Sequence, residues 1–476
     1  MYDYIVIGGG PCGLTTALYL AKYNRKILLI EKEDSVGGCH RVRRVNGLFT
    51  EHGPRITINN YFLLMDILAH FNLKFDDVFV KYDFSVNVST KKLLSLMNFN
   101  EMISFMYEFI KFMINENASK NITMKEFTLK YGFKSDTSEY IDTICRLTDG
   151  GTIDNYTLYE FLQIFNQNIF YNTYQPRLPN DIGLFKYWID KLQETNNVNI
   201  MYNSEIISIV PNNNKINHLI VKDKSRTFSV NAKNYIFAIP PKPMLNIIGK
   251  SPNRNMFGDY NDLLKWEKDS RYLVYIPINF HWDKDIKLIK KQGVTDSDYG
   301  IVYFVMSDYM KFNDARSKVV LTCTVKITDR KSSFNNKTAN ECTDVELIKE
   351  VFRQLKLYQP HLPDPTYSIL SPGIYKNNDL WDTVDTAYFY TKAGFRDNKS
   401  IYDNLFWIGT HNGNSEYSFT SMESAISNAI TLLHEIEPQT KKDIKFHQIF
   451  TFKNFILIII IVILILCITI KYKYKI

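Results

Sequence analysis

The residues that decide the fold lie at the start of the chain, where Asp3 to Gly13 read DYIVIGGGPCG. The apolar run before the glycines predicts a strand buried on both faces, as in a parallel sheet. The glycines predict a tight turn, and apolar residues at helical spacing after Gly13 predict a helix. A second apolar run, KILLIE at Lys26 to Glu31, predicts the next strand. The stretch therefore predicts a β–α–β unit.

The turn in this unit fits the pattern G-x-G-x-x-G, formed by Gly8, Gly10 and Gly13. Gly8 permits the tight turn, Gly10 lets the backbone approach a pyrophosphate, and Gly13 lets helix and strand pack closely. The N-terminus of the helix stabilises phosphate charge. Glu31, eighteen residues after Gly13, is placed to accept hydrogen bonds from a ribose hydroxyl. The pattern predicts dinucleotide binding but does not distinguish FAD from NAD.

The residues that follow Glu31 do distinguish these two cofactors. Asp34 to Gly38 read DSVGG, so Glu31 opens an E-x5-G-G pattern. This pattern resembles the flavin amine oxidase superfamily, which includes amine oxidases, protoporphyrinogen oxidase, carotenoid desaturases and UDP-galactopyranose mutase. The resemblance implies that the cofactor is FAD, because the second glycine pair in that superfamily lets the backbone approach the FAD diphosphate and ribityl chain.

Further segments resemble the same superfamily, in the same order along the chain. Phe49 to Ile56 (FTEHGPRI) corresponds to the stretch beside the isoalloxazine ring. Val198 to Val210, followed by Tyr235 to Pro240 (YIFAIP), resembles an inner strand hairpin and a V-x-A-x-P strand. Asn404 to Gly409 (NLFWIG) and Ser421 to Ile426 (SMESAI) resemble the closing motif, whose glycine approaches the cofactor and whose helix N-terminus faces the flavin.

The resemblance implies an α/β fold, in which a Rossmann-like FAD-binding domain is interrupted by an α+β substrate and cap domain. Apolar spacing within 59–170, including an amphipathic helix at Met102 to Phe112, predicts the helical cap, and apolar runs within 270–330 predict a substrate sheet. Aromatic residues of that sheet are assigned to the core rather than to a substrate cage: Tyr299, Tyr303 and Phe304.

These segments give the expected domain boundaries. The FAD-binding domain is assigned to 1–58, 185–245 and 385–436, and the helical cap and substrate-binding sheet to 59–184 and 246–384. A basic linker is expected at 437–452 and a transmembrane anchor at 453–470.

The resemblance also implies which positions contact FAD. They come from the two glycine loops, the second strand, the inner hairpin and the closing motif: Gly8, Gly10, Pro11, Cys12, Gly13, Glu31, Lys32, Gly37, Gly38, Arg55, Ile206, Gly409 and Met422. No metal site is expected, because the cysteines form no C-x-x-C pair and no metal-binding constellation is present.

Two residues are candidates for catalysis, His52 and Arg55, because EHGPR resembles the Y-G-x-H-I segment of the mutase with Arg55 in the place of its histidine. Arg55 beside the ring would bind an anionic substrate or stabilise the reduced flavin at N1. The alternatives are a surface or pyrophosphate-facing arginine and a packed, hydrogen-bonded histidine.

The chain departs from the pattern of the superfamily at three positions. Cys39 replaces the arginine of the G-G-R motif, and is interpreted as a small packed residue or as a thiol near the flavin. Tyr272 stands where amine oxidases commonly place a lysine near flavin N5. Thr410 and His411 follow the closing glycine, where the superfamily often has an acid. The tyrosine at 272 weakens the case for simple amine oxidation.

Composition predicts a folded, multi-domain chain, with 476 residues of which 45% are hydrophobic and 22% charged. The formal net charge is +7, but residues 437–476 carry seven lysines against Glu437 and Asp443, which is +5. The preceding 436 residues therefore carry only +2, which argues against a nucleic-acid groove.

The tail predicts membrane attachment. Phe455 to Ile470 read FILIIIIVILILCITI, an uncharged run that reaches bilayer length when Phe452 and its neighbours are included. No signal peptide precedes the first strand, so we expect a single-pass C-terminal anchor with the body in the cytoplasm. The bias towards Asn, Ile, Lys and Tyr suggests an A/T-rich genome, such as that of a protist or a large DNA virus, and a viral protein would lie in a host or virion membrane.

The sequence thus favours an FAD-dependent oxidoreductase that passes a hydride from a small-molecule substrate to flavin N5. One alternative is a non-redox flavin mutase acting on a UDP-sugar. The other is a membrane-tethered protein that binds FAD without catalysis.

Overall fold

The N-terminal stretch folds as its residues predict. β1 (Tyr2–Ile7) enters a loop of glycines, and α1 (Pro11–Lys22) begins at Pro11, a residue suited to the first helical turn. β2 (Ile27–Ile30) follows with all its side chains buried. The computed structural model describes residues 1–476 except 52, 54, 83–89, 273–274, 418–419 and 475–476.

β1 lies at the centre of a parallel sheet with the strand order β22-β12-β1-β2-β8. The other strands come from distant parts of the chain: β8 (Val198–Met201), β12 (Ala232–Phe237) and β22 (Leu405–Trp407). Tyr4 and Val6 point into one apolar cluster while Ile5 and Ile7 point into another. β1 is therefore covered on both faces, which explains its unbroken apolar sequence.

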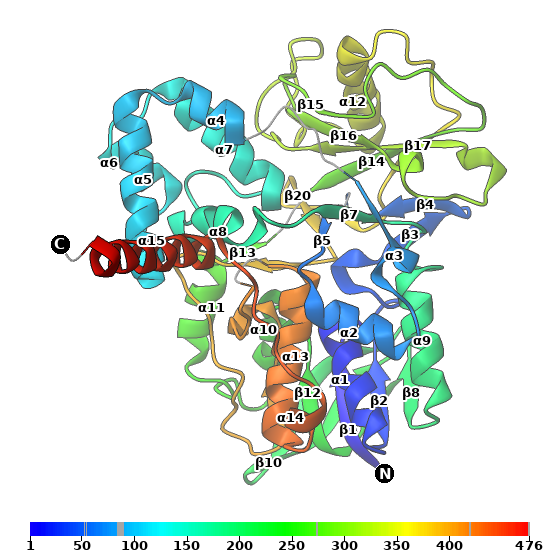
Figure 1. Ribbon diagram of the computed structural model, residues 1–476. Helices are drawn as coiled ribbons and strands as arrows, with labels where there is room; N and C mark the ends of the chain where they lie inside the picture. The colour runs from blue at the N-terminus through cyan, green and yellow to red at the C-terminus, as the bar shows by residue number, and fades with distance from the viewer. Residues whose placement is uncertain (52, 54, 83–89, 273–274, 418–419, 475–476) are drawn as a thin grey trace.

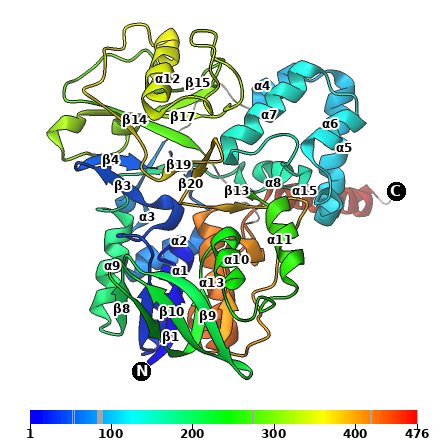
Figure 2. The same cartoon turned by 180° about the vertical axis from the view of Figure 1, so that it is seen from behind.

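Helices cover one face of this sheet and an antiparallel meander covers the other (Figures 1 and 2). The first layer consists of α1, α2 (Phe62–His70), α9 (Leu184–Glu194) and α13 (Met422–Ile436). The second layer consists of β9 (Glu205–Asn212), β10 (Lys215–Lys222), β11 (Thr227–Val230), α10 (Pro241–Gly249) and α11 (Tyr260–Asp269).

The prediction of a hairpin at Val198 to Val210 is wrong. β8 pairs in parallel with β2, whereas β9 pairs with β10 in the meander. The chain changes layers between them at Asn203, whose φ is 51° and whose N–H donates to Glu33 O. A turn between two apolar runs does not reveal whether the strands pair with each other.

A second sheet stands above the first and is antiparallel throughout, with the order β15-β16-β17-β14-β18. Its strands are β14 (Ile276–Trp282), β15 (Gln292–Val294), β16 (Ile301–Val305), β17 (Val319–Val325) and β18 (Tyr367–Leu370). One face packs on α12 (Asp344–Tyr358) and holds Tyr299 and Tyr303. The other face holds Phe304 and packs on the hairpin of β3 (Val42–Val45) and β4 (Leu48–Glu51). All three aromatic residues are core residues, as expected.

The helical region lies beside this sheet (Figure 1). It consists of α4 (Thr90–Leu96), α5 (Phe99–Ile114), α6 (Met124–Lys130), α7 (Ser135–Asp149) and α8 (Leu158–Asn168). α15 (Phe452–Tyr474) starts against α8 and extends away from the body. Shorter elements complete the described chain: α3 (Phe75–Val78), α14 (Thr440–Asp443), β5 (Thr57–Ile58), β6 (Phe79–Lys81), β7 (Thr173–Pro176), β13 (Arg271–Tyr272), β19 (Ile374–Asn377), β20 (Leu380–Thr383) and β21 (Tyr388–Phe389).

Two glycines of the first loop have different structural roles. A Cβ atom on Gly13 would lie 1.9 Å from the carbonyl oxygen of Gly8, so α1 packs on β1 at a distance that no side chain permits. A Cβ atom on Gly10 would meet only ordinary contacts, the nearest being Gly38 Cα at 3.7 Å. Gly13 is required by the fold itself, whereas the fold tolerates a methyl group at Gly10.

We therefore predict that alanine affects the stability of the protein without ligands differently at these two positions. Gly13→Ala should lower the free energy of unfolding by about 1–3 kcal/mol, because the helix must move off the strand. Gly10→Ala should change it by less than about 1 kcal/mol. Denaturant titration in detergent measures both, and equal stability of the two variants would contradict the packing described for Gly13.

A carboxyl group is buried at the end of β4. Glu51 is 2% exposed, and burial raises its pKa to about 7 despite the opposing charge of Arg55. A glutamate with a folded-state pKa above its ordinary value of 4.5 stabilises the fold below pH 4.5, and this stabilisation is lost as the pH rises through about 7. Glu51 is therefore expected to make the fold more stable in acid.

The variant Glu51→Gln tests this linkage. Relative to the wild type, it should gain on the order of 3 kcal/mol between pH 4.5 and pH 8, because an amide carries no charge to desolvate. Denaturant midpoints measured across this range give the difference. A matched control is the exposed Glu194→Gln, and a Glu51→Gln difference that stays constant with pH would contradict the raised pKa.

Candidate functional site

A cavity of about 630 Å³ lies where the strands of the parallel sheet end. Ile7, Ile30, Ala238 and Ile408 line it from the carboxyl ends of β1, β2, β12 and β22. Open parallel sheets bind their ligands at this edge, because the loops and helix N-termini converge there. The cavity is therefore the candidate ligand site.

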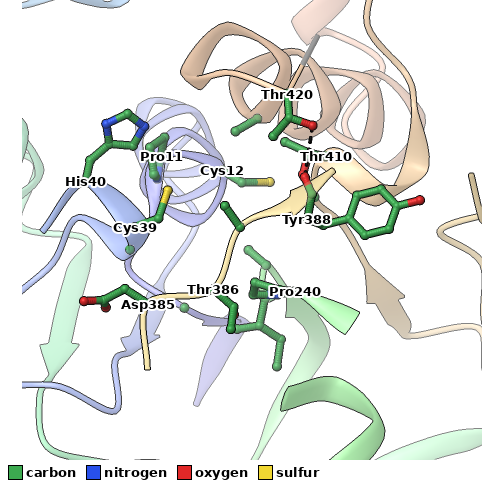
Figure 3. Close-up of a pocket in the computed structure, with 18 of the residues that line it drawn as sticks. Pro11, Cys12, Cys39, His40, Pro240, Asp385, Thr386, Tyr388, Thr410 and Thr420 are labelled. Carbon is green, nitrogen blue, oxygen red and sulfur yellow. Dashed lines mark hydrogen bonds between the residues drawn. The ribbon is translucent and has the colours of Figure 1, made fainter. Parts of the chain in front are cut away.

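Both glycine loops contribute to the wall of this cavity. Gly8, Gly10, Pro11 and Cys12 line it from the first loop and the start of α1. Figure 3 shows Pro11 beside the second loop, which carries Cys39 and His40. The second loop also contributes Gly38, where a Cβ atom would lie 3.2 Å from Gly10 Cα. The two backbones thus meet at their glycines and leave the space beyond them open.

Gly13 and Gly37, also expected to contact FAD, do not line the cavity but hold its walls together. Gly13 fixes α1 against β1, as described above. Gly37 donates its N–H to Gly9 O over 2.7 Å, and a Cβ atom there would lie 2.8 Å from the ring of Phe185. Both glycines therefore position the loops rather than face the ligand space.

Glu31 lines the cavity at the end of β2 and organises the loops around it. Its Oε2 accepts the Gly9 N–H over 2.7 Å, and its Oε1 accepts the Glu33 N–H over 3.0 Å. Arg41 Nη2 lies 3.0 Å from Glu31 Oε1. The carboxylate thus sits in a fixed place beside the first glycine loop.

The sequence did not reveal that Arg41 also pairs with Asp385. Arg41 Nη1 donates to Asp385 Oδ1 over 2.7 Å, and Arg43 Nε donates to Asp385 Oδ2 over 2.9 Å. Both Arg41 and Asp385 are almost completely buried and line the cavity. Buried charges persist only when paired, so this cluster fixes the segment before β21 against the second glycine loop.

The closing motif supplies the opposite wall. Gly409 lines the cavity after β22 and donates its N–H to Asn412 Oδ1 over 2.9 Å. Ser421 caps α13 by accepting the Ser424 N–H over 3.0 Å, and Met422 lines the cavity at the first turn of that helix. Thr420 Oγ1 donates to Tyr388 O over 2.9 Å (Figure 3). The N-terminus of α13 therefore faces the cavity.

Four predicted site residues remain: three expected FAD contacts, one of which is also a candidate for catalysis, and the second candidate for catalysis, His52. Lys32, Ile206 and Arg55 line the cavity. An Arg55 Nη2 proton is donated to Cys39 O, while Arg55 Nε, though buried, has no partner among the described residues. His52 lies outside the described residues, so its role stays a prediction.

The thiols that line the cavity are in their protonated form. Burial raises the pKa of Cys12 and of Cys39, which is opposed at Cys39 by the charge of Arg55. A thiol with a raised pKa is a poor nucleophile. Neither residue therefore presents a thiolate to a ligand.

The other two departures from the superfamily pattern are packed residues. Tyr272 pairs with Tyr388 across β13 and β21 and does not line the cavity. His411 lines the cavity, and its ring lies 4.5 Å from that of Trp407. Burial lowers the pKa of His411 to about 3, so its imidazole is neutral.

The far wall of the cavity comes from elements that carry no recognisable motif. Leu147 and Thr148 line it from α7, Ile164 and Asn168 from α8, and Tyr275 from the strand region of the second sheet. Apolar residues at helical spacing predict that a helix has a buried face but not what that face touches. Among the described residues, no cluster of His, Cys, Asp or Glu is placed to hold a metal ion.

Comparison with known proteins places these features in a family context. Residues 6–71 match the family model of an NAD(P)-binding Rossmann-like domain. UDP-galactopyranose mutase of Mycoplasma pneumoniae is 27% identical over 141 residues, which are 26% of this chain and 33% of the mutase. Digeranylgeranylglycerophospholipid reductase of Thermoplasma acidophilum is 56% identical over 36 residues, 8% of this chain and 9% of the reductase. The chain thus spans about a third or less of these curated relatives.

Solved structures match over nearly the whole chain. Putrescine oxidase is 12% identical with a TM-score of 0.63, covering 91% of this chain and 98% of its own. Cyclohexylamine oxidase of Brevibacterium oxydans is 11% identical with a TM-score of 0.60, covering 92% of this chain and 99% of its own. The glycine loops and these neighbours confirm the fold expected from the sequence: the chain has the fold of these two oxidases.

Proposed function

We propose that this chain is an FAD-dependent oxidoreductase acting on a small molecule. One observation carries the proposal: a single cavity connects Glu31 and both glycine loops to the N-terminus of α13 and the far wall from α7 and α8. A dinucleotide cofactor and a substrate would share such a space. The similarity to flavin oxidases over nine-tenths of the chain supports this assignment.

The residues present fit FAD. The space at Gly10 that a side chain would enter suits a pyrophosphate, Glu31 is placed for a ribose, and Gly409 and the N-terminus of α13 face the cavity from the opposite side. Bound FAD would supply a hydride acceptor at N5, reoxidised by dioxygen or another acceptor.

The protein would contribute binding, orientation and exclusion of water. Leu147, Ile164 and Tyr275 make the far wall largely apolar, which favours a substrate with an apolar part. Arg55 also lines the cavity, and its buried Nε has no hydrogen-bond partner among the described residues. It would hold negative charge, either on the substrate or on the reduced cofactor.

We further propose that α15 anchors the enzyme in a membrane. Phe452–Ile470 form 19 residues of mean hydropathy 3.0, none of them buried by the body. A helix of this length and composition matches the hydrocarbon core of a bilayer. The lysines that precede it would lie near the headgroups.

A second candidate function is a non-redox flavin mutase acting on a UDP-sugar. Arg55 favours it, since its unpaired Nε offers a donor for a diphosphate or an anionic intermediate. The partial similarity to UDP-galactopyranose mutase also favours it. A third possibility, FAD binding without catalysis, is an outcome of the same tests.

The FAD assignment predicts that Gly10→Val releases the cofactor. The two methyl groups would occupy the space of the pyrophosphate, so retention of FAD by the full chain in detergent should fall at least tenfold, about 1.4 kcal/mol. Flavin absorbance of the purified protein, relative to its protein absorbance, measures this.

A control separates cofactor loss from instability. Gly132→Val lies in the turn after α6 at φ +64°, with nothing within 4 Å of an added Cβ atom, so it should lower stability and still retain FAD. Full flavin retention by Gly10→Val would contradict the role of this loop, and a colourless wild type that takes up no added FAD would contradict the proposed function.

The mutase candidate predicts a different response to ligand. If the chain binds a UDP-sugar, UDP-galactopyranose should perturb the flavin spectrum of the reduced protein, and Arg55→Gln should weaken this response at least tenfold. The exposed Arg254→Gln, outside the cavity, should leave it unchanged. No response in the wild type, with bleaching by an amine or a porphyrinogen, favours the oxidase; a flavin that no ligand perturbs favours binding without catalysis.

A further inference from the structure

One helix of the cap exposes an unusual surface. α5 was expected to be amphipathic, and its buried side does contain Phe105, Phe109 and Phe112. Its exposed side, however, is also apolar. The exposed large side chains, here called the α5 stripe, are Phe99, Met102, Ile103, Met106, Tyr107, Ile110 and Ile114.

The α5 stripe is continuous along the helix. At about 100° of rotation per residue, its members fall within an arc of about 140° on one side. The structure describes every residue of α5, and in this helix Asn100 is the one polar residue that is exposed. Ile103 is 51% exposed and Ile114 is 79% exposed. An apolar surface of this extent on a soluble monomer marks an interaction site.

The acidic residues of α5 face the opposite way, into the protein. Glu101 accepts N–H groups from Asn98 over 2.7 Å and from Lys134 over 2.6 Å. Glu108 accepts from Lys111 and Lys130 and from the Tyr131 hydroxyl. The helix therefore has charges inside and apolar groups outside, an arrangement that suits a helix whose outer face meets lipid.

α5, the helix that carries the stripe, contacts the start of α15. The ring of Phe452, the first residue of α15, lies 5.7 Å from that of Phe109 in α5. The Lys453 N–H donates to Asn166 Oδ1 in α8 over 3.1 Å, which holds the start of α15 against the body. Figures 1 and 2 both show α15 leaving the body on the side where α5 and α6 lie.

Further exposed apolar residues adjoin the start of α15. Phe170, which follows α8, is exposed and contacts Phe450 and Phe455, with ring centroids 5.2 Å and 5.4 Å apart. Its neighbour Ile169 is exposed as well. The exposed apolar surface around the start of α15 therefore includes the end of α8.

We propose that the α5 stripe is a second membrane contact, embedded in the same bilayer that α15 spans. α5 would lie in the plane of the interface with its stripe at the boundary of headgroups and acyl chains, and Lys111 and Lys130 near the headgroups. The inference rests on the proposed anchoring by α15. It adds that the body is held against the bilayer in one orientation, because two separate contacts remove the rotation that one anchor allows.

Tryptophan scanning of the full chain in phosphatidylcholine vesicles tests this proposal. Ile110→Trp reports on the α5 stripe, Ile463→Trp reports on α15, and Leu357→Trp is the matched control on α12, where Leu357 is equally apolar and 62% exposed. Each variant is reconstituted with and without phosphatidylcholine brominated on its acyl chains. The emission of the five native tryptophans, measured in the wild type, is subtracted.

Bromolipid should quench Ile110→Trp and Ile463→Trp, each on the order of twofold, and leave Leu357→Trp unchanged. Quenching at 463 without quenching at 110 would overturn the α5 contact and leave the anchor standing. A tryptophan at 110 that is shielded from aqueous acrylamide but not quenched by bromolipid would overturn it too, in favour of a second protein chain. Absence of quenching at both 110 and 463 would overturn the anchor and, with it, the α5 contact. Near-ultraviolet circular dichroism verifies that each variant is folded.

Discussion

The structure depends on the close approach of backbones at the carboxyl end of β1. α1 can start beside this strand only because Gly13 places no atom against Gly8 O, where a Cβ atom would lie at 1.9 Å. The same absence of side chains lets the second loop reach the first, with Gly37 N–H bonded to Gly9 O. Since both loops border the cavity, the contacts that set the fold also set the shape of the candidate site.

A buried ion cluster extends this constraint to the C-terminal half of the chain. Arg41 bridges Glu31 and Asp385, residues separated by more than 350 positions. Desolvating these groups costs free energy that their mutual pairing offsets, so the cluster specifies one arrangement of the loops more than it adds to stability. The walls of the cavity therefore come from segments that cannot form independently of one another.

This difference between local and long-range contacts explains which features of the structure could be predicted from the sequence and which could not. β1, the glycine loop, α1 and Glu31 could be predicted because they form one short stretch of the chain, in which each residue type has its own structural role. The apolar tail could be predicted from its composition alone. Asp385 could not be found because no local pattern marks it as the partner of Arg41. The supposed hairpin at 198–210 failed for the same reason, since spacing predicts an apolar face but not its neighbour.

α8 connects the proposed anchor to the candidate site. Asn166 on this helix holds the first turn of α15, while Ile164 and Asn168, two residues to either side, line the cavity. An 11-residue helix that packs through a close-fitting core moves as a unit, because interior packing leaves little room for independent shifts. A force on α15 that displaces α8 therefore also displaces the far wall of the cavity. One helix thus contacts both the proposed anchor and the candidate site.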